Sequence, residues 1–313
     1  MKTFDRFLKI IDKTGVDRNI FADHQIPHVM ASGHHILSQR QVPGVECNTH
    51  ETVDGIVADI VIRRDTRLLR PFHLCFGMLP ESGTQHIKMS LRLEENAAVN
   101  VVSHCIFPNA RQVMHTMDAR IDVGASARLT YSDSHHHGSV GGITVIPKVV
   151  VNIAEGGLYR SDFSLTKGRV GTLDIDYDVT VADAGVAEMS SRIFGHETDQ
   201  IRIRERVVLA GEAARGLIKT RVAIENDAQA EIIGITEGNA AHVRGHMDCM
   251  EIVKDNARAS AQPIVRVSHP LAKVTHEAAI GSVDHQQLET LMAHGLSPEQ
   301  AVDLIVSGLL GSP

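Results

Sequence analysis

The hydrophobic positions divide the chain into three regions. Four apolar side chains near the N-terminus recur at helical spacing: Phe4, Phe7, Leu8 and Ile11. They predict a short amphipathic helix that ends near Gly15, after which the pattern is irregular to about Gly44. From about Val53 to Val267 the chain consists of short alternating runs rich in Val and Ile, separated by small or turn-forming residues. This second region is predicted to form β-strands.

One kind of turn recurs within the strand region. Small residues mark its copies: Ala97, Ala125, Gly156, Ala184, Ala213, Ala228 and Ala257. The steps between these markers are 28, 31, 28, 29, 15 and 29 residues, which cluster near multiples of about 14 to 15. A fixed period of turns between short strands is typical of a β-solenoid, although evenly spaced hairpins of a meander or sandwich remain an alternative. Small residues suit such corners because stacked backbones lie only about 4.8 Å apart.

The third region is predicted to be helical. One helix is expected between Asp284 and Gly295, and a second begins at Ser297, where Ser, Pro and Gln occupy the capping positions. The second helix carries an apolar stripe made of Ala301, Leu304, Ile305 and Leu309. Either the β region of the chain itself or a partner protein can cover this stripe. The expected division is an N-terminal region (1–50), a β-helix core (51–268) and a C-terminal helical segment (269–313).

Charge and composition remove several classes of function. A net charge of −7 with no basic tail disfavours nucleic-acid binding. No run of about 20 apolar residues is present to span a bilayer, and the N-terminus does not resemble a secretory signal, so a cytoplasmic protein without membrane insertion is expected. The chain has no phosphate-binding GxxxxGKS motif and no GxSxG elbow, so neither an ATPase nor a serine hydrolase is indicated.

Cysteine and histidine supply the candidate chemistry. The four cysteines lie too far apart for a disulfide scaffold or a CxxC zinc motif, and Cys47, Cys75 and Cys105 are spaced close to the repeat, as expected of core residues. Of the 19 histidines, three form a run at 135–137, which is typical of a solvated loop.

The best metal-binding pattern lies near the end of the strand region. In a strand over 245–251, His246 and Asp248 would share one face, whereas Met247, Cys249 and Glu251 would share the other. Downstream, His276 and Glu277 offer an imidazole and a carboxylate that point in opposite directions. Thiolate, imidazole and carboxylate together suit iron or zinc, and such a mixed, incomplete set suits a metal that is later released. Taken singly, Cys249 is more typical of a buried, inert thiol, and His276 and Glu277 are more typical of solvated polar residues.

Three segments resemble the C-terminal part of the SufB/SufD family, the scaffold proteins of the SUF iron–sulfur cluster assembly machinery. The segments are Gly245-His246-Met247-Asp248-Cys249, Val274-Thr275-His276-Glu277-Ala278-Ala279-Ile280-Gly281, and the run from Gly295 to Gly308 that begins Gly-Leu-Ser-Pro-Glu-Gln-Ala. The resemblance implies a right-handed parallel β-helix with C-terminal helices that dock the ABC ATPase SufC. It also implies that two β-helix subunits pair and that a nascent cluster forms at their interface.

The resemblance also implies roles for individual residues. Cys249 resembles the SufB cysteine that receives sulfur and ligates the cluster, His276 falls where SufD supplies a histidine, and Glu277 falls where SufB supplies a glutamate. His246, Asp248 and Glu251 are secondary candidates. One chain that carries Cys249, His276 and Glu277 together implies a homodimeric scaffold that is not itself an enzyme. Its implied partners are a SufC-type ATPase, a sulfur donor and a cluster acceptor, and its cargo is iron or a transient cluster. The sequence leaves flavin binding open.

Two other functions fit a β-helix. A polysaccharide-degrading enzyme would use carboxylates in a lateral groove, but a chain with no Trp and three Tyr lacks the aromatic residues that usually stack on sugar rings. A structural accessory subunit of an ABC ATPase is the remaining alternative.

Overall fold

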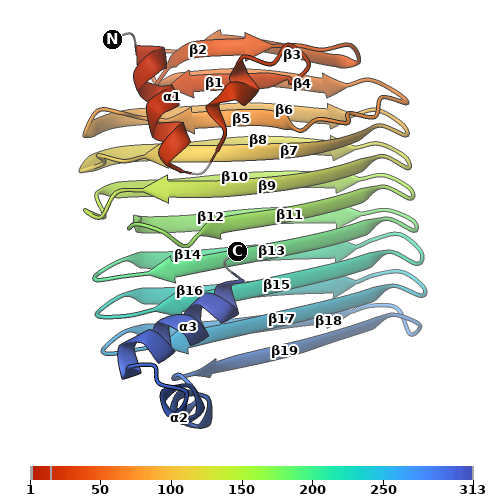
Figure 1. Ribbon diagram of the computed structural model, residues 1–313. Coiled ribbons are helices and arrows are strands. Elements are labelled where there is room, and N and C mark those ends of the chain that lie inside the picture. Colours follow the sequence, from red (N-terminus) through yellow and green to blue (C-terminus); the bar gives the residue numbers. More distant parts are fainter. Residues whose placement is uncertain (1–2, 15, 312–313) are drawn as a thin grey trace.

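The computed structural model describes residues 3–14 and 16–311, and it confirms the predicted β-solenoid with helices at both ends (Figure 1). The predicted N-terminal helix is α1 (Thr3–Lys13), and a short 3₁₀ helix, η1 (Arg18–Phe21), follows it. Gly15, the expected helix end, lies outside the described residues.

Two sheets form the walls of the solenoid. Sheet A contains, in spatial order, β2 (His35–Arg40), β1 (His28–Ser32), β5 (Phe72–Gly77), β7 (Ala98–Phe107), β9 (Arg128–His137), β11 (Leu158–Leu165), β13 (Val186–Gly195), β15 (Arg215–Ile224), β17 (Arg244–Val253) and β19 (Lys273–Gly281). Sheet B contains β3 (Val45–Glu51), β4 (Gly55–Ile62), β6 (Ser82–Leu93), β8 (Gln112–Val123), β10 (Ile143–Ile153), β12 (Gly171–Val181), β14 (Gln200–Leu209), β16 (Gln229–Gly238) and β18 (Arg258–Val267).

Alternation of apolar and polar residues explains why the strands form two walls around one core. In β14, for example, Ile201 and Ile203 are buried, whereas the intervening Arg202 faces outward. From β4 onward, successive strands alternate between the sheets, so each strand pairs in parallel with the strand one coil away, as β15 does with β13 and β17. The pairs β1–β2 and β3–β4 are antiparallel. The inward side chains of both sheets therefore stack into a single continuous core, as a solenoid requires.

Five of the seven predicted small turns stack on one another at one corner of the solenoid, whereas Ala228 and Ala257 lie at the opposite corner. At this corner the residues with positive φ include Asn96, Ser126, Gly156, Ala184 and Ala213. Their backbone N–H groups donate to a carbonyl in the next coil, for example from Gly156 to Asp183 at 2.9 Å and from Ala184 to Glu212 at 2.8 Å. The repeat in the sequence therefore marks corners whose backbone hydrogen bonds run from coil to coil.

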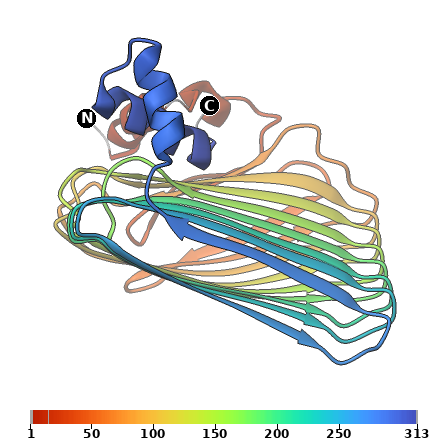
Figure 2. The same cartoon turned by 90° about the horizontal axis from the view of Figure 1, so that it is seen from below.

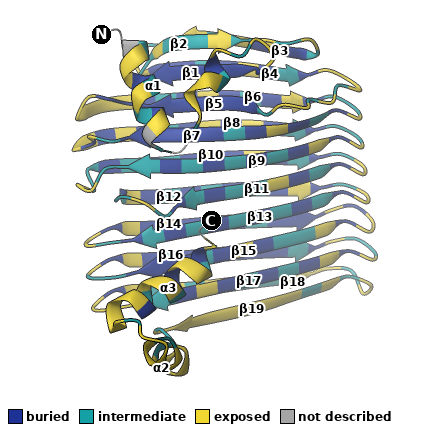
Figure 3. Cartoon of the chain, in the orientation of Figure 1, coloured by how far each residue is buried: buried dark blue, intermediate teal, exposed yellow. Residues whose placement is uncertain are grey.

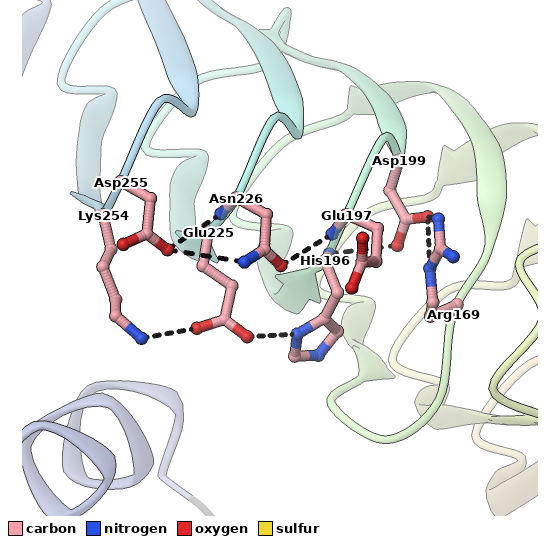
Figure 4. Close-up of polar contacts among 8 residues, drawn as sticks. All are labelled: Arg169, His196, Glu197, Asp199, Glu225, Asn226, Lys254 and Asp255. Atoms are coloured by element: carbon pink, nitrogen blue, oxygen red, sulfur yellow. Dashed lines mark hydrogen bonds and ion pairs between the residues drawn. The ribbon is translucent and has the colours of Figure 1, made fainter. Parts of the chain in front are cut away.

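Polar side chains join the turns at the opposite corner of the C-terminal coils (Figure 4). The Lys254 ammonium lies 3.0 Å from the Glu225 carboxylate, which also contacts His196 Nδ1 at 2.8 Å. In the same turn as His196, the fully buried Asp199 carboxylate pairs at 3.0 Å with Arg169 of the preceding coil. These contacts hold successive coils, including those that carry the candidate site, in alignment along the solenoid axis.

The N-terminal part differs from the sequence expectation, because the stretch predicted to be irregular contains β1 and β2. All five residues of β1 are buried, since α1 and η1 cover the outer face of sheet A through Phe7, Ile11 and Phe21. A strand buried on both faces shows no alternation, so its sequence offers no period-2 signal. The division of the chain into 1–50, 51–268 and 269–313 stays a prediction.

The C-terminal helices lie beside the solenoid and do not cover its end (Figure 2). They are α2 (His285–Ala293) and α3 (Pro298–Leu310), as predicted. Ser297 and Gln300 form the expected capping box at the start of α3. The last coil, β18 and β19, is therefore largely exposed, in contrast to the coils before it (Figure 3).

Among the described residues, no helix combines the length and the apolar character needed to cross a membrane.

Candidate functional site

Cys249 points into the solenoid, one strand away from the end of sheet A. It lies on β17 together with Met247 and Glu251, and all three side chains are buried, whereas His246 and Asp248 on the same strand face outward and are half-buried. The predicted distribution of these five residues between two faces is therefore confirmed. It follows from the two-residue period of the strand.

His276 and Glu277 lie on β19, the last strand of sheet A, and point in opposite directions. The register pairs His276 with Met247 and Glu277 with Asp248, while Cys249 pairs with Ala278. Paired residues of parallel strands share a face, so His276 is on the interior side, diagonally adjacent to Cys249. Glu277 is on the outer side. Both residues are exposed because no further strand follows β19 in the sheet within residues 3–14 and 16–311.

A group of polar residues behind Cys249 escaped the sequence analysis. Thr220 pairs with Cys249 across the sheet, and its hydroxyl donates to the Glu205 carboxylate at 3.0 Å. Ser191 donates to the other oxygen of Glu205 at 2.6 Å. Burial raises the pKa of Glu205. We call Cys249, Glu251, Thr220 and Glu205 the Cys249 cluster; no spacing in the sequence reveals it, because its members come from different strands of both sheets.

Burial also controls the protonation of the Cys249 cluster. It raises the pKa of the Cys249 thiol to about 12, and the nearby Glu251 carboxylate adds to this effect. It raises the pKa of Glu251 to about 7, against the pull of Arg221. Neither carboxylate oxygen of Glu251 has a hydrogen-bond partner among the described residues. A positively charged ligand would therefore be stabilised here, because it would deprotonate the thiol and neutralise Glu251.

The outward-facing candidates are engaged in other contacts. The Asp248 carboxylate pairs with Arg221, whose guanidinium also donates to the Asp248 carbonyl at 2.9 Å. His246 Nδ1 contacts the Thr275 hydroxyl at 2.9 Å. These contacts give Asp248 and His246 a structural role in joining β17 to its neighbours.

The apolar stripe of α3 is divided between the chain's own core and solvent. Val306 and Leu310 pack on Ala223 of β15. Of the predicted stripe, Ala301 is fully buried, so its assignment to a partner surface is wrong as the helix is placed here. Leu304 is 51% exposed, and Ile305 and Leu309 are half-buried. α3 therefore buries one of its apolar sides against the chain and leaves the other exposed.

A second thiol group lies deeper in the solenoid. Cys105 on β7, His115 on β8, and Asp133 and His135 on β9 all point inward, and each is at most 7% exposed. We call these four residues the Cys105 cluster. The loop predicted for 135–137 is wrong, because these histidines end β9 and His135 is buried. The expectation that Cys105 is an ordinary core residue missed its polar neighbours, because the pairing of β7 with β9 cannot be read from the sequence alone.

The chain is thus a parallel β-helix protein that holds one thiol cluster deep in its core and a second near the open end of the solenoid. The family described as "SUF system FeS cluster assembly, SufBD core domain" matches residues 78–309. The chain belongs to this SufBD family of iron–sulfur cluster assembly proteins.

Similar proteins span nearly the whole chain. An iron–sulfur cluster assembly SufBD family protein of Methanocaldococcus jannaschii is 39% identical over 91% of this chain and 90% of its own length. A protein with the same family name from Pyrococcus horikoshii is 34% identical over 99% of this chain and 94% of its own length. One from Archaeoglobus fulgidus is 28% identical over 69% of this chain and 58% of its own length.

Proposed function

We propose that this chain is a scaffold subunit that assembles iron–sulfur clusters as a homodimer, together with an ABC ATPase of the SufC type. One observation carries the proposal: Cys249 and His276 lie on one face of neighbouring strands at the uncovered end of the solenoid. The names of the similar proteins, which describe iron–sulfur cluster assembly, support it.

The open end favours pairing with a second copy. β19 and β18 are the terminal strands of sheets A and B, so each leaves one row of backbone N–H and C=O groups unpaired by this chain. Inward-facing residues of this coil are also exposed, including Ile280 at 46%. A twofold pairing of these edges would cover both the backbone groups and the apolar side chains. It would also bring the Cys249, His276 and Glu277 side chains of the two copies to one seam.

The residues at this seam suit the capture of sulfur and iron. Cys249 attacks the sulfane sulfur of a donor's persulfide, the donor's sulfur–sulfur bond breaks, and the donor cysteine leaves with the Cys249 proton as a thiol. The imidazole of His276 and the carboxylate of Glu251, which share the inner face with Cys249, then supply nitrogen and oxygen ligands for ferrous iron. Glu277 offers a carboxylate on the outer side of the same seam. Iron and the transient cluster are cargo that passes to an acceptor protein, so the scaffold completes no catalytic turnover itself.

The exposed part of α3 is the proposed ATPase contact. Leu304, Ile305 and Leu309 form it, while Val306 and Leu310 anchor the helix to β15. Arg192 of β13 donates to the backbone carbonyls of Leu310 and Gly311, at 3.3 and 3.1 Å. These contacts connect α3 to the C-terminal coils. Closure of two ATPase subunits on ATP would therefore be transmitted to the seam, whereas ATP hydrolysis itself belongs to the partner.

Anaerobic reconstitution with ferrous iron and sulfide tests the scaffold function. The wild-type chain, co-expressed with a SUF-type ATPase, is expected to develop the visible absorption of an iron–sulfur cluster. Cys249→Ser should lose this absorption, whereas Cys47→Ser should keep it, because Cys47 is a buried thiol at the far end of the core. An unchanged spectrum in Cys249→Ser would remove this thiol from the proposed site.

Failure of the ATPase to co-purify would contradict the partner assignment. Leu304→Asp should abolish co-purification, because it places a charge in the exposed apolar stripe. Leu69→Asp, at a side chain that is 97% exposed far from α3, is the matched control and should leave the complex intact.

A further inference from the structure

The Cys105 cluster is assembled by three consecutive strands that enclose one side of the core. The register of β7 and β9 places Cys105 directly beside His135, with Asp133 two residues earlier on the same face. His115 reaches the Cys105 sulfur from β8 in the opposite sheet. Four potential metal ligands of three chemical types therefore converge from both walls of the solenoid.

The distances within the cluster match those between ligand atoms that share one ion. Cys105 Sγ lies 3.7 Å from His115 Nε2 and 3.7 Å from Asp133 Oδ1, and Asp133 Oδ2 lies 3.6 Å from His135 Nε2. The last distance exceeds that of an N–H···O hydrogen bond. A tetrahedral metal ion has bonds of about 2.3 Å to sulfur and about 2.0–2.1 Å to nitrogen. Its sulfur and nitrogen ligand atoms therefore lie about 3.5 Å apart, and its nitrogen and oxygen ligand atoms about 3.3 Å apart. The ligand atoms of Cys105, Asp133 and His135 all lie within 4.8 Å of one another.

A chain of hydrogen bonds orients His135 as a metal ligand. His137 Nδ1 lies 3.2 Å from the Arg169 carbonyl, which can only accept, so this nitrogen carries the proton. The other ring nitrogen of His137, Nε2, lies 3.2 Å from His135 Nδ1, so His137 holds one nitrogen of the His135 ring. The remaining nitrogen of His135, Nε2, faces the Asp133 carboxylate at 3.6 Å. Such a second ring contact is typical of metal-bound histidines.

The Asp133 carboxylate lies in a dry core, where a bound cation would offset the cost of burying its charge. Asp133 and His135 are only 5% and 4% exposed, so water has little access to either. His115 is equally buried, at 3%, and its Nδ1 has no hydrogen-bond partner among the described residues. An unpaired buried polar group destabilises the fold unless a ligand satisfies it. A cavity of about 10 Å³, lined in part by Tyr131 and Asp133, provides about the room of one water molecule beside the cluster.

We propose that Cys105, Asp133 and His135, assisted by His115, bind one divalent transition-metal ion of the zinc and ferrous-iron class inside the solenoid. A mixed set of thiolate, imidazole and carboxylate suits these metals and disfavours magnesium and calcium. Because the cluster is sealed by neighbouring coils, the ion is resident, in contrast to the cargo iron at the open end. The site does not depend on the proposed scaffold function.

Cobalt substitution tests the site directly. The full chain is produced in minimal medium supplemented with Co²⁺ and purified anaerobically. About one Co²⁺ per protomer is expected, with the thiolate-to-cobalt charge-transfer absorption of a sulfur-bound ion. Cys105→Ser should lose this absorption, whereas Cys249→Ser and Cys47→Ser should retain it. Absence of the band in the wild type, its persistence in Cys105→Ser, or its loss in Cys249→Ser would each overturn the proposal.

A second measurement keeps the test decisive if Cys105→Ser fails to fold. X-ray absorption of the zinc-loaded Cys249→Ser chain counts the atoms bound to the metal. One sulfur near 2.3 Å together with nitrogen or oxygen ligands near 2.0–2.1 Å is expected. A shell without sulfur would refute the site, whatever the behaviour of the Cys105 variant. In the same background, Asp133→Asn should shorten the half-life of the bound metal against a chelator at least tenfold, and an unchanged half-life would exclude Asp133 as a ligand.

Discussion

The two thiol clusters occupy the same core but differ in how deeply the solenoid encloses them. Five strand spacings of about 4.8 Å separate β7 from β17 in sheet A, so the thiols lie roughly 24 Å apart. Coils on both sides cover Cys105, whereas only the exposed β19 follows the strand of Cys249. In a solenoid, position along the axis therefore decides whether a buried thiol can exchange its ligand.

The electrostatic surroundings of the two thiols also differ. Burial alone would raise the pKa of Asp133, but the adjacent His135 and Ser103 outweigh it and lower the pKa. Glu205, which accepts only from two hydroxyl groups, keeps a raised pKa. An ionised carboxylate among imidazoles suits a permanently bound cation, while a protonated one suits a site that is empty for part of its cycle.

The largest expected effect concerns packing around the sealed cluster. Phe107 is fully buried, and its ring lies 4.8 Å from that of His115. Phe107→Ala should therefore lower the free energy of unfolding by about 3–5 kcal/mol. Ile280→Ala, at a side chain that is 46% exposed on β19, should cost less than about 1 kcal/mol. Chemical denaturation of both variants measures the difference. Equal losses would contradict the contrast between the sealed Cys105 cluster and the open end of the solenoid.

Thiol reactivity should separate the two clusters next. Opening of β19 and β18 alone exposes Cys249, whereas Cys105 requires several coils to separate. Pulsed alkylation of the metal-free native chain, read by mass spectrometry, should label Cys249 at least about tenfold faster than Cys105. Comparable rates would show that the solenoid does not open from its C-terminal end.

Pairing of the open ends should respond to charge at the last coil. Ile280→Lys is expected to weaken self-association at least tenfold, because two like charges would meet at the seam of a twofold dimer. Val53→Lys introduces the same charge at a side chain that is 96% exposed near the N-terminal end, and it should leave association unchanged. Analytical ultracentrifugation distinguishes these outcomes. A wild-type chain that remains monomeric at high concentration would exclude the seam.

A smaller effect is expected from the pH dependence of Glu205. Its pKa is raised in the folded chain, so folding favours its protonated form, and the associated stability is fully present below the ordinary value of 4.5. This contribution is lost as the pH rises through the higher folded pKa. Glu205→Gln should therefore lose less stability than the wild type between pH 4 and pH 8 in thermal unfolding. A steeper loss in the variant would mean that Glu205 is ionised in the fold.

The sequence predicts the elements of this molecule better than its interior contacts. The turn markers and the Ser297–Gln300 capping box were correct because each depends on a few neighbouring residues. The inward direction of His135 was missed because a run of three histidines is typical of a solvated loop, and its pairing with Cys105 depends on the register between strands 30 residues apart. The facing of Cys249 was predicted because alternation within one strand determines it, but its neighbours Thr220 and Glu205 come from other coils.

Metal analysis of three chains tests the central claim, which is that the two thiols belong to two separate metal sites, one resident and one for cargo. Wild type, Cys105→Ser and Cys249→Ser are analysed for metal and acid-labile sulfide per protomer, before and after anaerobic reconstitution. The account predicts that Cys105→Ser lacks the metal present at purification but still gains iron and sulfide. It predicts the reverse for Cys249→Ser. Loss of both metals in either variant, or of neither in both, would contradict the separation of a resident site from a cargo site.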